Sequence, residues 1–176
     1  MDKLSKYSIS FAGLSVGNHH FNFSIGDAFF ENFEYSEIQK ANVLVNVEFQ
    51  KQSTMFILLF EISGIVNIVC DRCLDNFDFP IKGENKLIVK FGESQFEETD
   101  EILIIPEKEH QLNISQFIYE YIHLCLPLQR VHPENEEGKS ECNIEVLKKL
   151  NDHKTHNNPE VPIDERWEAL KNIKLN

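Results

Sequence analysis

The stretch that decides the fold is Met55-Phe-Ile-Leu-Leu-Phe-Glu-Ile-Ser-Gly-Ile-Val-Asn-Ile-Val-Cys-Asp-Arg-Cys-Leu-Asp-Asn-Phe-Asp-Phe-Pro-Ile81. Residues 55–62 are apolar at nearly every position, which is typical of a strand buried on both faces. Residues 65–70 form a second apolar run after Gly64, and residues 77–81 alternate between apolar and polar side chains. The pattern predicts consecutive β-strands around a C-x-x-C turn.

The same alternation with a period of two extends outward in both directions. Residues 43–49 come before it, with a polar hairpin loop at 51–54, and residues 87–91 and 102–105 follow it. Gly83 and Gly92 are expected to break the later strands, and Pro106 to end the last one. Short strands separated by turn signals predict an antiparallel β-sheet or partial barrel over about residues 5–106. Its expected core includes Phe21, Phe23, Val45, Val47, Ile57, Leu59 and Ile68.

The apolar period then lengthens to that of a helix. Asn113 is suited to cap a helix at 113–126, Gln116 would complete a capping box, and Pro127 ends the helix. Cys125 falls on the apolar stripe of this helix, which favours a small buried side chain over a metal ligand. The sheet packed by this helix predicts an α+β fold.

The C-terminal part is expected to contain short helices. Residues 1–150 should form a single α+β domain, in which Asn143 caps the last helix. Residues 151–176 should form a flexible linker and a short helix that begins at Asp164. Trp167 on that helix could fold back onto the domain or anchor a partner, and both interpretations stay open.

The charge of the chain argues against direct, tight binding to nucleic acid. Most of the net charge of −12 lies in residues 93–145, and the sequence shows no basic face that could replace counterions on phosphates. An acidic surface suits a basic protein partner, although plain solubility explains it equally well. No apolar run could cross a bilayer, and the N-terminus lacks a signal-peptide core. We therefore expect a cytoplasmic protein whose cysteines are reduced unless they hold a metal.

The pair Cys70 and Cys73 is open to three interpretations: a metal site, a redox pair or a structural turn. A redox pair of the thioredoxin type needs a helix at the first cysteine, whereas a strand follows here, so redox catalysis is disfavoured. A zinc site needs a second pair of ligands, for which His132 and Cys142 are the natural candidates. Against zinc, Leu74 replaces the glycine that often follows such a pair, and the second pair is widely spaced. Two reduced thiols packed at a tight turn are the alternative.

Several short motifs occur in an order that resembles the YceD family of bacteria and plastids, which is named for accumulation of large-subunit ribosomal RNA. They span nearly the whole chain, and Glu165 departs from them where the family commonly has proline. The motifs are Gly13-Leu14 to Gly17, His20-Phe21-x-Phe23, Cys70-Asp-Arg-Cys-Leu74, Glu120-x-x-x-Leu124-x-Leu126-Pro127, Val131-His-Pro133 with the later Cys142, and Asp164-x-Arg166-Trp167-Glu-Ala-Leu170.

The resemblance implies a role in accumulation or processing of large-subunit ribosomal RNA, and so in ribosome assembly, with no known catalytic activity. The chain also contains no phosphate-binding glycine loop, no G-x-S-x-G and no H-E-x-x-H. We expect a non-enzymatic factor that binds a ribosomal or assembly protein, reaches pre-ribosomal RNA only indirectly, and uses neither a membrane nor a small-molecule substrate. Arg72, Arg166 and Trp167 are candidate partner contacts. The rival hypothesis is a metal-dependent or redox enzyme centred on Cys70 and Cys73.

Overall fold

The structure is a computed structural model that describes residues 4–92, 101–135 and 137–153. The chain divides into two compact units, Met1–Cys142 and Asn143–Asn176, and each is described by itself. The predicted division at residue 150 stays a prediction, because residues 154–176, with Arg166 and Trp167, lie outside the described residues. None of the described helices is long and apolar enough to span a membrane.

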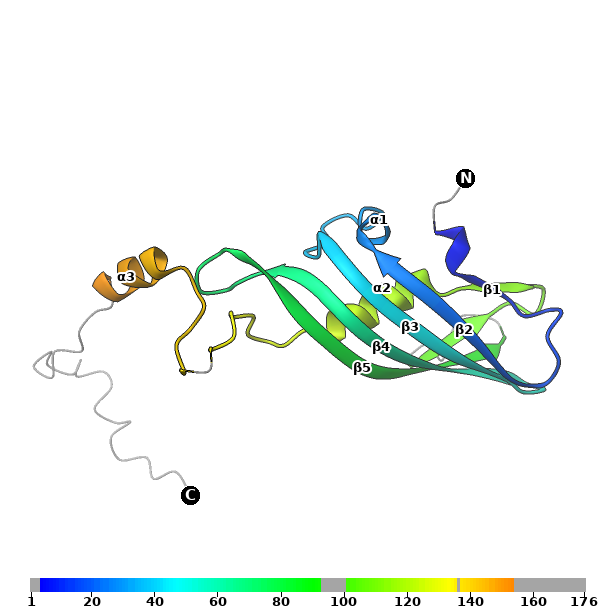
Figure 1. The fold of residues 1–176 in the computed structure, drawn as a ribbon. Coiled ribbons are helices and arrows are strands. Elements are labelled where there is room, and N and C mark those ends of the chain that lie inside the picture. Colours follow the sequence, from blue (N-terminus) through cyan, green and yellow to red (C-terminus); the bar gives the residue numbers. More distant parts are fainter. Residues whose placement is uncertain (1–3, 93–100, 136, 154–176) are drawn as a thin grey trace, which may run out of the picture. The chain divides into compact units, whose positions relative to one another are not determined.

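The first unit is built on a five-stranded sheet in which the strands follow one another in chain order (Figure 1). These strands are β2 (Gly17–Gly26), β3 (Lys40–Lys51), β4 (Met55–Val69), β5 (Asn76–Phe91) and β6 (Ile102–Ile105). β2 to β5 pair antiparallel, as predicted, whereas β6 pairs parallel to β5, so the sheet is mixed. The sheet stays open and does not close into a barrel. The predicted α+β class is confirmed.

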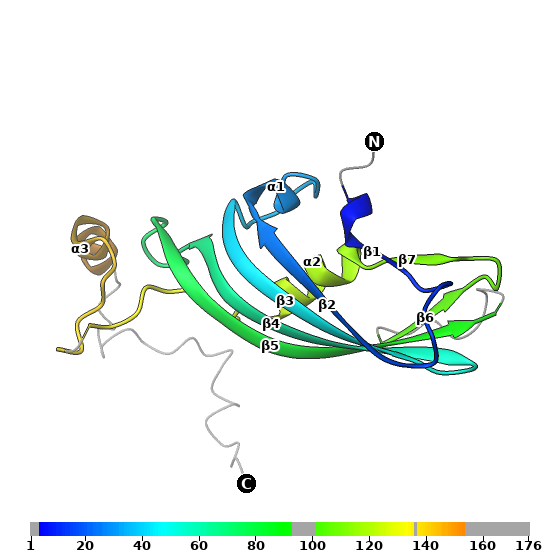
Figure 2. The ribbon, with the colours of Figure 1, turned by 45° about the vertical axis from the view of Figure 1, so that its right-hand side comes forward.

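Smaller elements pack beside this sheet. The 3-10 helix η1 (Ser5–Tyr7) leads into β1 (Ser8–Ser10), which pairs antiparallel with β7 (Gln111–Asn113). The short helix α1 (Asp27–Phe30) follows β2, and α2 (Ser115–Leu124) lies within the curve of the sheet (Figure 2). Phe60 of β4 contacts Tyr121 of α2, with 5.0 Å between ring centroids, so α2 covers one face of the sheet.

The two central strands are longer than the sequence predicts, because they continue through glycines that were expected to end them. β4 runs through Gly64, whose φ of +156° suits glycine, and a Cβ there would lie 2.3 Å from the backbone oxygen of Asn42. β5 runs through Gly83, where a Cβ would lie 2.4 Å from Sγ of Cys125. Both glycines therefore allow a close approach within or onto the sheet rather than a break.

The core lies on the face of the sheet that α2 covers. On β4 the buried side chains are Phe56, Leu58, Phe60 and Ile62, so the prediction that Ile57 and Leu59 belong to the core is wrong. These two residues are half-exposed on the opposite face, because side chains along a strand alternate between faces. Phe21 and Phe23 of β2 are also only half-buried. The remaining predicted core residues, Val45, Val47 and Ile68, are confirmed.

The helices follow their predicted caps in part. The N-cap residue of α2 is Ile114, which makes no side-chain cap bond, and not the predicted Asn113; Oδ1 of Asn113 still accepts hydrogen bonds from the backbone N–H and the hydroxyl of Ser115, at 2.9 and 2.6 Å. Gln116 donates to Glu120 rather than back to the start of the helix, so the expected capping box is incomplete. In the second unit, Asn143 caps α3 (Ile144–Asp152) as predicted, since its Oδ1 accepts from the backbone N–H of Glu145 at 3.0 Å.

Candidate metal centre

The turn between β4 and β5 points both of its cysteines inward. The backbone N–H of Leu74 donates to the carbonyl of Cys70 at 2.9 Å, and the N–H of Cys70 donates to the carbonyl of Asp75 at 3.0 Å. The N–H of Arg72 points at Sγ of Cys70, 3.4 Å away. As a result Cys70 is 0% exposed and Cys73 is 3% exposed. The turn thus presents two thiols to its interior and keeps Arg72 at the surface.

Leu74 adopts the conformation of the glycine that it replaces. Its φ is +64°, in the left-handed region that glycine occupies without strain. A residue with a Cβ pays a penalty of about 1–2 kcal/mol there. The absence of glycine therefore does not prevent the turn that a metal-binding C-x-x-C needs. The hydrogen bonds of the turn keep Leu74 in this conformation despite its energetic cost.

The second pair of candidate ligands is brought together by a small loop after α2. Glu134 and Ser140 form a single antiparallel bridge, and the N–H of Glu141 donates to the carbonyl of Pro133 at 3.1 Å. His132 and Cys142 flank this bridge and lie at the open end of the loop. The loop therefore brings His132 and Cys142 close together although they are widely spaced in the sequence.

The loop is attached to the β4–β5 turn by reciprocal hydrogen bonds. The N–H of Asp71 donates to the carbonyl of Arg130 at 2.7 Å, and the N–H of Arg130 donates to Oδ2 of Asp71 at 2.7 Å. The Arg130 guanidinium also forms an ion pair with Glu37. The ring of His132 packs on that of Phe77 of β5, with 4.5 Å between centroids and 30° between planes. These contacts fix the position of the imidazole, in the way that residues packed around the ligands of known metal sites orient those ligands.

The four predicted ligands meet in one cluster. One ligand atom from each of Cys70, Cys73, His132 and Cys142 lies within 4.8 Å of all the others. The sulfur atoms of Cys70 and Cys142 are 3.7 Å apart, and Sγ of Cys73 is 3.4 Å from Nδ1 of His132. Zinc bonds of about 2.3 Å to sulfur and about 2.0–2.1 Å to nitrogen give tetrahedral edges of about 3.8 and 3.6 Å. Both closest contacts match those edges, so the residues fit zinc.

The electrostatics of the cluster favour a charged Cys70 beside a neutral Cys142. Burial alone would raise the pKa of the Cys70 thiol, but the backbone N–H groups of Cys73, Arg72 and His132 and the imidazole outweigh it and lower the pKa to about 6. Burial raises the pKa of the Cys142 thiol, and the neighbouring Cys70 raises it further. A bound cation would stabilise both as thiolates, because metal ligation deprotonates thiols.

The four candidate ligands would fill every position of a closed, tetrahedral structural site. All four ligands come from the protein and three of them are buried, whereas catalytic zinc sites keep a position open for water or substrate. Cys125 does not belong to the cluster: it follows α2, its thiol donates to the carbonyl of Tyr121 at 3.1 Å, and it is half-buried. The prediction of a buried side chain on the helix is therefore met only in part, because Cys125 is half-buried and lies just after α2.

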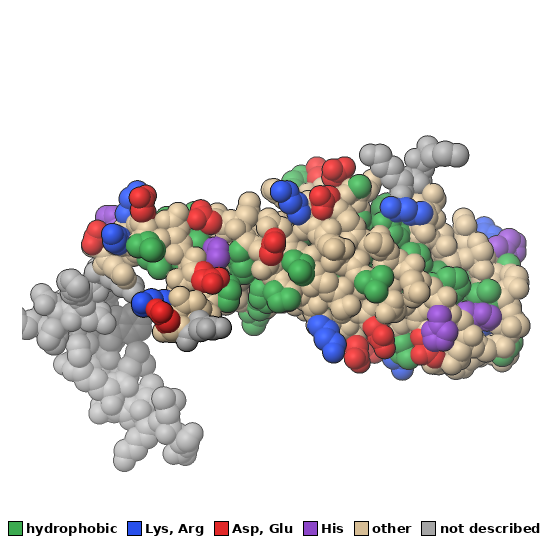
Figure 3. All heavy atoms as spheres, in the orientation of Figure 1, with side chains coloured by type: hydrophobic (Ala, Val, Ile, Leu, Met, Phe, Trp, Pro, Cys, Tyr) green, Lys and Arg blue, Asp and Glu red, His purple; other side chains and the backbone are tan. Residues whose placement is uncertain are grey.

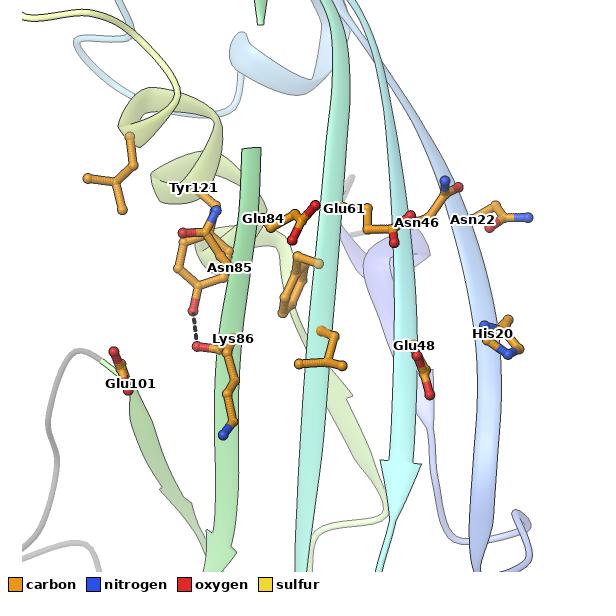
Figure 4. Close-up of a pocket in the computed structure, with 13 residues that line it drawn as sticks. His20, Asn22, Asn46, Glu48, Glu61, Glu84, Asn85, Lys86, Glu101 and Tyr121 are labelled. Atoms are coloured by element: carbon orange, nitrogen blue, oxygen red, sulfur yellow. Dashed lines mark hydrogen bonds between the residues drawn. The ribbon is translucent and has the colours of Figure 1, made fainter. Parts of the chain in front are cut away.

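The sequence did not reveal a polar groove on the sheet. Its volume is about 970 Å³, and it runs across β2 to β5, as far as Tyr121 and Leu124 at the end of α2 (Figure 4). Acidic and histidine side chains also gather along the lower margin of the sheet in a space-filling view (Figure 3). The available sequence signal for this groove was a set of polar residues at alternate positions of adjacent strands, which place their side chains on the same face of the sheet. The charged and histidine residues of the groove are His20, Glu48, Glu61, Glu84, Lys86 and Glu101.

Comparison with known proteins places the chain in a family. A family model described as "Large ribosomal RNA subunit accumulation protein YceD" matches residues 58–174, which is more than half of the chain. The match covers all four candidate ligands, but not the motifs before residue 58 that also suggested the resemblance. The searches of curated proteins and of solved structures found no match. The chain, with its turn of two cysteines and the loop that brings His132 and Cys142 to it, belongs to the YceD family.

Proposed function

We propose that this protein is a non-enzymatic factor that supports accumulation or processing of large-subunit ribosomal RNA, and so ribosome assembly, by binding protein partners in the cytoplasm. The observation that carries the proposal is the family match, because the family is named for accumulation of the large ribosomal RNA subunit and not for a reaction.

We further propose that Cys70, Cys73, His132 and Cys142 hold a structural zinc ion. Bound there, zinc would supply a cross-link between the β4–β5 turn and the loop that ends at Cys142. Support comes from the two tetrahedral contact distances and from the lack of regular secondary structure in residues 125–133. A segment with so few backbone pairings gains much of its order from such a link, which would also fix Arg72 at the surface of the turn.

The proposed partner is a basic ribosomal or assembly protein. A net charge of −12 opposes direct contact with phosphates and favours approach of a basic protein. Pre-ribosomal RNA would then be reached through that protein.

The rival proposal, a redox or metal-dependent enzyme at Cys70 and Cys73, has one observation in its favour, the lowered pKa of Cys70. Two features weigh against it. The turn leads into strand β5 rather than a helix, and both thiols are buried, whereas redox cysteines sit in accessible, electropositive surroundings. Turnover by the purified chain that disappears in a folded Cys70→Ser variant would favour this rival.

The test is depletion of the protein in its own cells, followed by complementation. We expect depletion to lower mature large-subunit ribosomal RNA relative to small-subunit RNA, and to reduce the large-subunit peak on sucrose gradients. The wild-type chain and Cys125→Ser should restore both, whereas Cys73→Ser and Cys142→Ser should not. Normal ribosomal RNA levels and subunit profiles in depleted cells would overturn the proposed function.

A further inference from the structure

The sheet has a second face that α2 does not cover. Because side chains alternate along a strand, the residues between the buried positions of β3 and β4 project from this face. Leu44 and Ile65 on it are 46% and 50% exposed, and Ile57 and Leu59 are half-exposed. A sheet face with this much exposed aliphatic surface in the first unit can serve as a docking surface.

The strand register divides this face into an aliphatic row and an acidic row. Ile57 on β4 stands opposite Ile88 on β5, which stands opposite Ile102 on β6. Two rows further along, Glu61 on β4 stands directly opposite Glu84 on β5. Figure 4 shows both side chains, which come from the neighbouring strands β4 and β5. The face therefore combines an apolar strip with a pair of like charges, and Lys82 and Lys86 flank Glu84 on the same face of β5.

The opposition of Glu61 and Glu84 is unfavourable in the isolated chain. Like charges directly opposite each other in an antiparallel pair destabilise a sheet. Within the described residues neither carboxylate makes a hydrogen bond or an ion pair with another side chain. A cation from outside would remove this repulsion.

The groove that reaches this face, and that also includes Phe60, Asn85 and Tyr121 of the covered side, has a matching charge. Its lining contains the carboxylates of Glu48, Glu61, Glu84 and Glu101, against a single lysine, Lys86. A metal ion would find two carboxylates at Glu61 and Glu84, fewer oxygen ligands than a protein calcium site supplies, and neither residue belongs to the metal-type cluster found among the described residues. RNA does not fit either, since its phosphates would meet carboxylates.

We propose that this uncovered face of the sheet binds a basic, Lys- or Arg-containing segment of a partner protein. The proposal rests on the proposed function and adds to it the surface that the partner contacts. The cationic heads of the segment pair with Glu61, Glu84 and Glu48, and the aliphatic stems or apolar neighbours pack on Leu59 and Ile57. Binding removes the repulsion between the two opposed carboxylates.

The test uses the full chain and a fluorescein-labelled peptide of alternating lysine and leucine, with fluorescence anisotropy at physiological salt. The double variant Glu61→Lys, Glu84→Lys should weaken binding by about tenfold or more. The matched control is Glu31→Lys, Glu34→Lys, which changes net charge equally at two exposed sites outside the groove and should weaken binding less than about twofold. Equal weakening by both double variants would mean non-specific attraction and would overturn the proposal.

A single variant separates binding from folding. Glu84→Gln removes one of the opposed charges, so it should raise the melting temperature of the free chain while it weakens binding of the peptide. A structural role for Glu84 predicts the reverse, a lower melting temperature. An unchanged peptide affinity in Glu84→Gln and in the double variant would also overturn the proposal.

Two further outcomes identify a different occupant or separate this proposal from the proposed function. Self-association in sedimentation that the double variant abolishes would assign the face to a second copy of this chain, and so contradict the proposal. If depletion lowers large-subunit RNA but the peptide binds both double variants equally, the docking surface is wrong and the function stands. If the peptide requires Glu61 and Glu84 but depletion has no effect on RNA, the function is wrong and the surface stands.

Discussion

The packing of α2 on the sheet can be tested through the contact between Gly83 and Cys125. A Cβ at Gly83 would lie 2.4 Å from Sγ of Cys125, far inside contact distance, but 3.8 Å from Cβ of Cys125, which is ordinary van der Waals contact. The backbone of Gly83 is not in the left-handed region, so alanine can adopt it. The sign of the Gly83→Ala effect should therefore depend on whether the sulfur is present.

The magnitude follows from two opposing effects. Overpacking costs about 1–3 kcal/mol, here through displacement of the Cys125 side chain and loss of its hydrogen bond to Tyr121. Replacement of glycine by alanine stabilises by about 0.4–1 kcal/mol through the unfolded state. Gly83→Ala should thus destabilise the wild-type chain by about 1 kcal/mol. In a Cys125→Ala background it should be neutral or stabilise by up to about 1 kcal/mol.

The assay is a double-mutant cycle by urea unfolding of the wild-type chain, the two single variants and the double variant. The expected coupling energy between positions 83 and 125 is about 1–3 kcal/mol, well above the error for independent sites. If Gly83→Ala has the same effect in both backgrounds, Cys125 does not pack on Gly83, and the placement of the end of α2 against β5 is wrong.

Three further predictions test the strands and the helix. Gly64→Ala should destabilise by about 3 kcal/mol or more in urea unfolding, because its Cβ would lie 2.3 Å from the oxygen of Asn42 at a φ unfavourable to alanine; a loss below about 1 kcal/mol would contradict the strand pairing. Leu58→Ala should cost about 2–5 kcal/mol and Leu59→Ala much less, since only Leu58 is buried; equal losses would contradict the parity of β4. Burial raises the pKa of Tyr121 to about 12. Because this folded pKa lies above the ordinary value of 10, its contribution to stability is complete below pH 10 and is lost between pH 10 and 12. Tyr121→Phe should therefore flatten the fall in stability over that range, and an unchanged slope would refute the shift.

Much of the fold could be predicted from the sequence because its signals are local. Alternation along residues 43–49 and the cap at Asn143 depend on neighbouring residues alone. Gly64 and Gly83 were misinterpreted as breaks because the reason for each glycine is a contact from a distant segment, the backbone near Asn42 and the thiol of Cys125. No local pattern distinguishes a glycine that ends a strand from one that admits a neighbour.

The difference between local signals and distant contacts also explains which features of β4, of the cysteine–histidine cluster and of the acidic row could be predicted. Residues 55–62 are so uniformly apolar that the sequence could not show whether the odd-numbered or the even-numbered side chains face α2. Leu59 was therefore assigned to the core. The four residues of the cysteine–histidine cluster could be selected from the sequence because cysteine and histidine are chemically specific, and the structure brings them together. The acidic row remained hidden because Glu61 and Glu84 become neighbours only through the register of β4 and β5.

The zinc proposal depends on whether Cys70, Cys73, His132 and Cys142 bind a metal ion. Native mass spectrometry of the full chain, purified without a metal-affinity tag, measures this in one experiment. We predict about one zinc per chain, retained in Cys125→Ser and lost in Cys142→Ser, because a structural site needs all four ligands and Cys125 is not among them. A metal-free wild-type chain with four freely titrating thiols, and the same melting temperature with and without a chelator, would contradict the account.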